Sequence, residues 1–216
     1  AAHLSPANLW VLGGKGVGKT TLLRKVEEAL GDELHVIMLA GKYLNERSAL
    51  LDILERSGVF AAGAPGISLE ARLAEHFRSP AAQSTAALIV VDDVDSVTNQ
   101  DALNDVKRIQ DLGKANDWPL VTLFSGRAVP EQLRPESSDR YTEVYLPRPG
   151  RNECGEIIEH RLTASGSTTS VFTPSALERI ITRANGDIYT LLTMADLCLQ
   201  VGSVAKVHTI DDELVR

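Results

Sequence analysis

The residues best suited to chemistry form a glycine-rich loop near the start of the chain. Residues 13–20 read Gly-Gly-Lys-Gly-Val-Gly-Lys-Thr, which is a complete G-x-x-x-x-G-K-[ST] phosphate-binding motif. Its glycines let the backbone wrap closely around a phosphate, where a Cβ atom would clash. Backbone N–H groups at the start of the following helix can then bind the anion, with the helix dipole behind them. The motif therefore predicts binding of a nucleotide through its phosphates.

Each position of this loop has an expected task. Lys19 is expected to reach the β- and γ-phosphates, and the Thr20 hydroxyl to ligate Mg²⁺. The motif also predicts nucleotide contacts from the rest of the loop and its first helical turn, namely Gly13, Gly14, Gly16, Val17, Gly18 and Thr21. A glycine-rich turn without a ligand is the plain alternative. A dinucleotide-binding fingerprint fits worse, because Lys19 stands where its last glycine is required.

A pair of carboxylates provides the second half of the expected site. The apolar run of residues 88–91 ends in Asp92 and Asp93. We expect Asp92 to hold the Mg²⁺ ion, and Asp93 stands where a general base would polarise an attacking water. Acids after a buried run are otherwise ordinary solvated groups, so the phosphate-binding loop upstream is what favours a metal site here.

Three further polar residues are candidates for contact with the terminal phosphate. Ser125 and Arg127 follow the next apolar run and could sense the γ-phosphate, although ordinary loop polarity would explain them equally well. Arg140 precedes the last apolar run and could act as an arginine finger on the nucleotide of a neighbouring subunit. A solvated surface arginine is the alternative for Arg140.

Alternating strands and helices must position these residues. Strands are expected at residues 8–12, 33–40, 86–91, 119–124 and 142–146, with helices at about 20–31, 44–58, 69–77 and 102–112. Such alternation predicts a parallel sheet with helices on both faces, and ligands bind at the carboxyl ends of its strands. The acids follow the third strand, which is typical of ATPases with an extra catalytic acid. The chain lacks an Asn-Lys-x-Asp motif for guanine, so adenine is the expected base.

Composition changes at residues 147–150, which read Pro-Arg-Pro-Gly, and the remainder reads as helical. Helices are expected at about 153–165, 173–186 and 188–201, and a last one from Thr209. We therefore predict an α/β P-loop NTPase core with a five-stranded parallel sheet and helices on both faces, followed by a small all-helical lid. The expected boundaries are residues 1–148 for the core and 149–216 for the lid.

The bulk composition narrows the classes of protein. The 216 residues carry a formal net charge of −7, which argues against a domain-wide basic surface for DNA. Cys154 and Cys198 lie far apart in sequence and form no disulfide framework, and the five histidines show no metal-binding spacing. No apolar run approaches the roughly 18 residues of a membrane span. We expect a cytoplasmic protein without a membrane span, and the short segment before the first strand is typical of an excised domain.

These motifs resemble those of the AAA+ ATPases, and specifically the ExeA-type ATPases of the general secretion pathway and the TniB-like transposition ATPases. The similarity starts at the phosphate-binding loop and covers nearly the whole chain. It continues in the segments Ser-Gly-Arg at 125–127, Pro-Glu-Gln-Leu at 130–133, Glu-Ile-Ile-Glu-His-Arg-Leu at 156–162, Phe-Thr-Pro-Ser-Ala-Leu at 172–177 and Asn-Gly at 185–186.

The resemblance implies a function and also a competing one. It implies an ATPase that binds and slowly hydrolyses Mg-ATP, forms a homo-oligomer with Arg140 acting in trans, and drives or gates assembly of a partner complex in secretion, transposition or envelope assembly. Two positions differ from the family: Asp93 replaces a glutamate, and Tyr189 replaces an arginine of the lid. Both differences favour the alternative, a nucleotide-gated switch or scaffold similar to the STAND signalling ATPases, with little hydrolysis.

Overall fold

The chain divides into two compact units. The computed structural model describes residues 7–58, 68–79, 86–134, 141–167 and 169–215. Contacts assign Ala1–Leu12 and Lys19–Tyr145 to the first unit, and Gly13–Gly18 with Leu146–Arg216 to the second. We call these the sheet unit and the helical unit and describe each by itself. The boundary between residues 148 and 149 that composition suggested stays a prediction.

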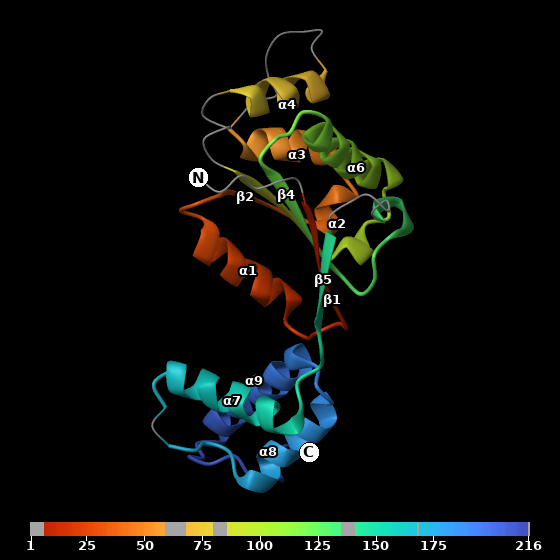
Figure 1. Ribbon diagram of the computed structural model, residues 1–216. Helices are drawn as coiled ribbons and strands as arrows, with labels where there is room; N and C mark the ends of the chain where they lie inside the picture. Colours follow the sequence, from red (N-terminus) through yellow and green to blue (C-terminus); the bar gives the residue numbers. More distant parts are fainter. Residues whose placement is uncertain (1–6, 59–67, 80–85, 135–140, 168, 216) are drawn as a thin grey trace. The chain divides into compact units, whose positions relative to one another are not determined.

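A five-stranded sheet in the order β2-β3-β4-β1-β5 forms the centre of the sheet unit (Figure 1). The pairs β2·β3, β3·β4 and β4·β1 are parallel. The strands are β1 (Ala7–Gly13), β2 (His35–Ala40), β3 (Ala87–Asp92), β4 (Leu120–Gly126) and β5 (Tyr141–Leu146). All five lie where the apolar runs predicted them, so the predicted α/β sheet is confirmed.

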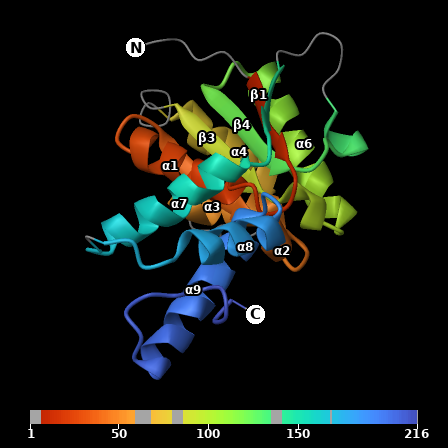
Figure 2. The same ribbon diagram turned by 90° about the horizontal axis from the view of Figure 1, so that it is seen from below.

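Helices pack against both faces of this sheet (Figures 1 and 2). One face contacts α1, and the other contacts α3 and α6. The helices of the unit are α1 (Lys19–Leu30), α2 (Gly41–Leu44), α3 (Ala49–Arg56), α4 (Leu69–Arg78) and α6 (Gln100–Ala115), with short 3₁₀ turns at η1 (Val94–Ser96) and η2 (Glu131–Leu133). Since side chains alternate along a strand, both faces of the central strands are apolar and buried.

An aromatic pair anchors the face under α3 and α6. The Trp10 ring on β1 stacks on the Phe124 ring on β4, with centroids 4.3 Å apart and an interplanar angle of 19°. Both side chains are fully buried, together with Ile37 and Ile89 on the neighbouring strands. Burial of each large apolar side chain contributes about 1.5–3 kcal/mol, so this layer holds β1 and β4 together just before the phosphate-binding loop.

A buried polar cluster adds directional contacts to the same pair of strands. The Gln110 amide on α6 donates to Asn8 Oδ1 at 2.7 Å and to Thr122 Oγ1 at 2.9 Å. The Thr122 hydroxyl donates to Asn8 Oδ1 at 2.6 Å. Because Asn8 and Thr122 are Cα partners in the β1·β4 ladder, these bonds favour one register of the two strands.

One helix predicted by the sequence is divided in the structure. The helix expected over residues 44–58 is replaced by α2, which ends at Leu44, and α3, which begins at Ala49. Asn45 forms the C-cap of α2, and its side chain is engaged in hydrogen bonds with residues 96–99. These tertiary contacts end the helix although the leucine spacing continues through it.

The helical unit contains α7 (Arg151–Ala164), α8 (Pro174–Ala184) and α9 (Ile188–Ala205) around its own apolar core. Thr173 caps α8 by accepting a hydrogen bond from the Ala176 N–H, and Pro174 occupies the first turn. Cys154 and Ile158 on α7 pack with Ile180 on α8 and Leu191 on α9. The three helices match the predicted ones to within a few residues.

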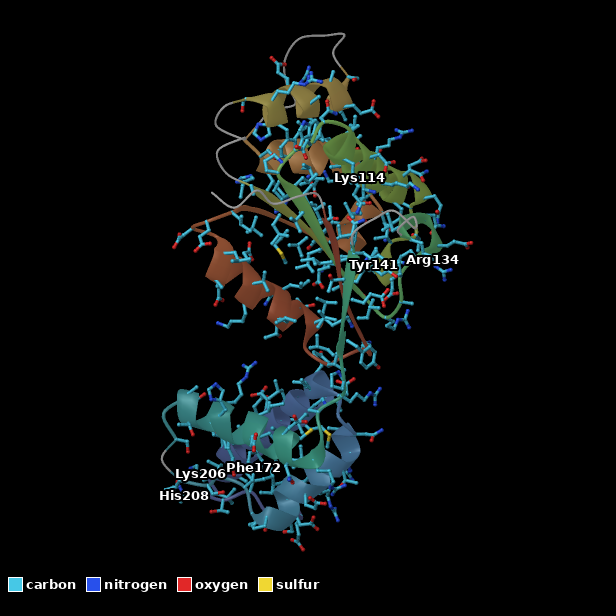
Figure 3. All side chains as sticks on the ribbon, viewed as in Figure 1. Lys114, Arg134, Tyr141, Phe172, Lys206 and His208 are labelled. Carbon is cyan, nitrogen blue, oxygen red and sulfur yellow. The ribbon has the colours of Figure 1, made fainter. Side chains whose placement is uncertain are left out.

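The helix predicted from Thr209 is wrong. Ile210 instead forms a parallel bridge with Phe172, which Figure 3 labels near Lys206 and His208. The Ile210 N–H donates to the Val171 carbonyl at 2.8 Å, and the Thr173 N–H donates to the Ile210 carbonyl at 2.9 Å. Because the N–H and the carbonyl of Ile210 both bond in this bridge, Ile210 cannot be part of a helix. The predicted capping pattern leads instead to a turn at residues 212–215.

By length and composition alone, α9 is apolar enough to cross a membrane, and it is the one such helix in the described part of the chain. Polar residues interrupt its apolar ones, so a search of the sequence for an uninterrupted apolar run did not find it. Leu191, Ala195, Cys198 and Gly202 of α9 are buried in the core of the helical unit. This burial covers 22% of the helix, and the large apolar side chains of Leu197, Val201 and Val204 are exposed, so packing within that unit explains part of its apolar character.

The buried polar cluster makes a testable contribution to stability. We expect Thr122→Val to lower the free energy of unfolding by about 1–3 kcal/mol, because the change is nearly isosteric yet removes a hydrogen-bonding partner of Asn8 and Gln110 in a dry environment. Thr193→Val on the exposed side of α9 is the control and should change stability by less than about 0.5 kcal/mol. Urea denaturation followed by circular dichroism measures both. Equal effects of the two changes would contradict a role for the cluster.

Candidate functional site

The carboxylate of Asp92 is held by hydroxyl groups on both of its oxygens. The Thr20 hydroxyl at the start of α1 donates to Asp92 Oδ2 at 2.8 Å. The Ser125 hydroxyl at the end of β4 donates to Asp92 Oδ1 at 2.5 Å. Because β3 lies between β2 and β4, its last residue reaches the carboxyl edge of the sheet beside these two partners. The sheet thus brings together residues that lie far apart in sequence.

This arrangement has the donor chemistry of a magnesium site. A carboxylate and a hydroxyl, Asp92 and Thr20, approach each other at hydrogen-bond distance. Mg²⁺ prefers oxygen ligands, and it commonly takes one or two protein oxygens together with phosphate and water. The two residues that the sequence nominated for the metal therefore lie together and fit that ion. Their role as metal ligands remains a prediction.

Asp93 occupies a sharp turn directly after the strand. Its backbone has φ 56° and ψ 54°, the left-handed region, which costs an ordinary residue about 1–2 kcal/mol and which Asp tolerates better than most. The Asp93 N–H donates to Ser125 Oγ at 2.9 Å. The Asp93 carbonyl accepts from the Ser96 hydroxyl at 2.7 Å and from the Ser96 N–H at 2.9 Å. The left-handed conformation of Asp93 is thus held by Ser125 at its N–H and by Ser96 at its carbonyl.

Ser125 and Arg127 have different environments. Ser125 is completely buried and connects Asp92 with the Asp93 backbone, so its hydroxyl acts on the acid pair in this structure. The Arg127 side chain is 70% exposed, and its Nε lies 3.5 Å from Asp95 Oδ2. The Arg127 N–H also donates to Asp95 Oδ2 at 2.5 Å. Arg140 lies outside the described residues.

Asp95 was missed in the sequence, although it links the turn after β3 to the end of β4. The signal that could have identified it is a third acid shortly after the strand, since a carboxylate there can reach the neighbouring strand end. Asp95 is 17% exposed and receives both the N–H and the guanidinium of Arg127. We call residues 93–96, which follow β3, the acidic turn. Its Asp95 carboxylate therefore pairs with the Arg127 guanidinium of the same chain.

The glycines of the phosphate-binding loop pack within the helical unit. Gly16 has φ +75° and Gly18 has φ +96°, conformations that strongly favour glycine. A Cβ atom on Gly16 would also collide with the Asp187 carboxylate. The Gly16 carbonyl accepts a hydrogen bond from the Ile188 N–H at 2.8 Å. The loop is thereby attached to the N-terminus of α9.

Asp187 is a second residue that sequence analysis did not single out. Its Oδ1 accepts a hydrogen bond from the Thr190 N–H at 2.9 Å, so it caps α9. An acid immediately before an apolar helix is a recognisable N-cap signal. Tyr189 follows in the first turn and is 73% exposed. The capped helix end therefore presents an aromatic side chain to solvent.

A cavity of about 450 Å³ lies in the helical unit next to Val17 of the loop. Its walls include the apolar side chains of Val17, Ile157 and Ile188 together with Pro147. Polar groups enter from α7, among them Glu156 and His160. Glu153 and Arg161 line it as well, so ionisable side chains stand beside the apolar ones, and the volume lies in the range of small-molecule pockets.

The two cysteines offer no reactive thiol. Burial raises the pKa of the Cys154 thiol, and the charge of Glu153 raises it further. Burial likewise raises the pKa of the Cys198 thiol. A raised pKa keeps a thiol protonated and weakly nucleophilic at neutral pH. Both residues act as small apolar groups in the core of the helical unit.

A family model matches the chain. Residues 4–134 match the AAA domain family, which covers more than half of the chain. No curated protein sequence matches the chain. The matched segment contains the phosphate-binding loop, Asp92 and Asp93, and Ser125.

Solved structures with the same fold include Cdc6p, ORC1 and RuvB proteins. Cdc6p from Pyrobaculum aerophilum has a TM-score of 0.72 at 17% identity, covering 94% of this chain and 57% of that one. The Aeropyrum pernix ORC1 protein in complex with DNA has a TM-score of 0.73 at 18% identity, covering 97% and 58%. The Thermotoga maritima RuvB Holliday junction branch migration motor has a TM-score of 0.62 at 17% identity, covering 99% and 60%. This chain therefore spans less than two thirds of each.

A matched pair of glycines tests the packing of the loop. Gly16 and Gly58 have nearly equal φ angles, +75° and +76°, but a Cβ on Gly58 meets no atom within 4 Å. Both changes to alanine should cost about 1–2 kcal/mol for the left-handed backbone. Gly16→Ala should cost more, because it must also displace Asp187. Urea unfolding of both variants measures the difference, and equal losses would show that the Asp187 contact does not constrain the loop.

Proposed function

We propose, from the premise that the chain belongs to the AAA domain family, that it binds Mg-ATP and hydrolyses it slowly to drive or gate assembly of a partner complex. The observation that carries this proposal is the Asp92 carboxylate, held on one oxygen by Thr20 and on the other by Ser125. The proposal is supported because the carboxylate expected to bind the metal, the loop hydroxyl and the γ-phosphate sensor candidate lie within one hydrogen-bonded group.

The proposed binding mode assigns each part of the nucleotide to residues of the chain. The loop from Gly13 to Thr21 would bind the phosphates, with Lys19 as the counter-charge. Thr20 and Asp92 would hold Mg²⁺, which neutralises phosphate charge. Asp93 would accept a proton from the attacking water. The cavity beside Val17, with the Ile157 and Ile188 side chains as apolar walls, would receive the adenine base.

Oligomerisation and partners are part of the same proposal. Arg140 would act in trans as an arginine finger on the nucleotide of a neighbouring copy. Secretion, transposition and envelope assembly remain the candidate pathways, in line with the ExeA- and TniB-like motifs, and we expect the protein to act in the cytoplasm. The similarity to a DNA-bound ORC1 protein makes DNA worth testing as a partner, whereas the net charge of −7 argues against a broad DNA-binding face.

A second candidate function follows from the two departures from the family pattern. Asp93 is one methylene shorter than glutamate, and Tyr189 provides no cation for the γ-phosphate. A protein of this kind could bind ATP or ADP tightly and act as a nucleotide-gated switch or scaffold. Nucleotide affinity would then be retained while turnover is absent.

Removal of the loop lysine tests nucleotide binding. Lys19→Ala should weaken binding of a fluorescent ATP analogue by roughly 10- to 150-fold, because a charge-assisted contact contributes about 1.5–3 kcal/mol. Lys25→Ala is the matched control on the same helix, since Lys25 is exposed and pairs with Glu28. Unaltered affinity in the Lys19 variant would exclude the proposed site.

Phosphate release separates the two candidate functions. If the protein is an ATPase, Asp93→Ala should reduce the rate by about 10²–10⁴-fold, the usual contribution of a general base. Asp111→Ala on the exposed face of α6 is the control and should retain the wild-type rate. A wild-type rate no higher than that of the Asp93 variant, at concentrations where the protein self-associates, would favour the scaffold.

A further inference from the structure

We propose that Asn45 is a positioning residue for Asp93, an inference that rests on the proposed ATP hydrolysis. Asn45 lies just after α2, on the β2 side of the acidic turn, and its side chain does not reach the nucleotide motifs directly. It acts by fixing the segment that follows Asp93. No sequence motif marks this residue.

Four hydrogen bonds connect the Asn45 side chain with residues 96–99. Its Oδ1 accepts from the Thr98 N–H at 2.7 Å, from the Thr98 hydroxyl at 3.1 Å and from the Asn99 N–H at 3.1 Å. Its Nδ2 donates to the Ser96 carbonyl at 2.9 Å. A single partly buried amide thus binds three of the four residues from 96 to 99, leaving this segment little freedom to move.

Ser96 transmits this constraint to Asp93. Asn45 holds the Ser96 carbonyl, while the N–H and the hydroxyl of Ser96 both donate to the Asp93 carbonyl. The chain of contacts from Asn45 to the proposed base therefore passes through one residue. Loss of the amide would release Ser96 and, with it, two hydrogen bonds that support the left-handed conformation of Asp93.

Gly41 reinforces the same side of the turn by close packing. A Cβ atom at Gly41 would collide with the Asp93 carbonyl oxygen and would lie 2.7 Å from Ser96 Oγ. The first residue of α2 is thus seated directly against the turn. Since Asn45 is the C-cap of the same four-residue helix, α2 contacts the turn at both of its ends.

The opposite side of the turn is held by β4. Ser125 accepts from the Asp93 N–H, and the Arg127 N–H donates to Asp95. The turn is therefore braced between the ends of the two strands that flank β3. Ser125 supports the turn from the end of β4, and Asn45 supports it from the side of β2.

The first test separates positioning from folding. Asn45→Ala should lower kcat for phosphate release by about 10- to 100-fold, because displacement of a reacting group by about 1 Å costs up to two orders of magnitude. The KM for ATP and the affinity for a fluorescent ATP analogue should stay within about twofold, since no phosphate or metal contact is removed. Asn116→Ala is the control: Asn116 also bonds a carbonyl, that of Leu112, but at the far end of α6.

A conservative variant keeps the test decisive if the alanine variant fails to fold. Asn45→Asp retains the acceptor for Thr98 and Asn99 and loses only the donation to Ser96. It should fold, and because the lost donation to Ser96 is the contact that leads to Asp93, kcat should fall about as far as in Asn45→Ala, again with unchanged nucleotide affinity. A wild-type kcat in a folded Asn45 variant would overturn the proposal.

A double-variant cycle identifies the residue through which Asn45 acts. In an Asp93→Asn background, Asn45→Ala should lower the single-turnover rate no further, because the base it positions is already lost. An equal further loss in that background would overturn the proposal. Wild-type protein that fails to bind ATP or to release phosphate would refute the proposed function and the positioning role with it, whereas active wild-type protein with an equally active, folded Asn45 variant would overturn the positioning role alone.

Discussion

The double hydroxyl contact to the Asp92 carboxylate is the constraint on which the sheet unit depends. It joins the start of α1, the end of β3 and the end of β4 in one group. For the carboxylate to sit there, β3 must lie between two parallel partners, and so it must be apolar on both faces. The run Ala-Leu-Ile-Val-Val before Asp92 meets that demand, with each of its side chains buried.

The structure shows why some features were predictable from sequence and others were not. Strand positions and the phosphate-binding loop have local signals, namely apolar runs and a contiguous motif. The contacts of Asn45, in contrast, reach residues 51–54 positions away, and an asparagine after a short helix is an ordinary cap. Tertiary bonding also explains the two errors: Asn45 divides the helix expected over residues 44–58, and the Phe172–Ile210 bridge replaces the one expected from Thr209.

The glycine loop shows that one residue type can be required for different reasons. At Gly18 the left-handed backbone is the reason, because a Cβ there would meet no atom closer than 3.6 Å. At Gly13 space is the reason, since a Cβ would lie 2.6 Å from the Leu146 carbonyl. At Gly16 both reasons apply. The sequence motif shows only that glycine stands at each position. The structure distinguishes the positions where glycine is needed for its backbone angles from those where it is needed for space.

The shorter acid at position 93 increases the importance of its backbone. A glutamate has one more rotatable bond than an aspartate, so its carboxylate can adjust to a misplaced main chain. Asp93 has one rotatable bond fewer, so the position of its carboxylate depends more closely on the left-handed main chain. Precise placement then depends on the groups that hold the turn, which are Ser125 from β4, Ser96 within the turn and Asn45 behind Ser96. If Asp93 is the base, as we propose, hydrolysis should depend strongly on the residues around the turn, while nucleotide binding through the phosphate-binding loop should depend on them much less.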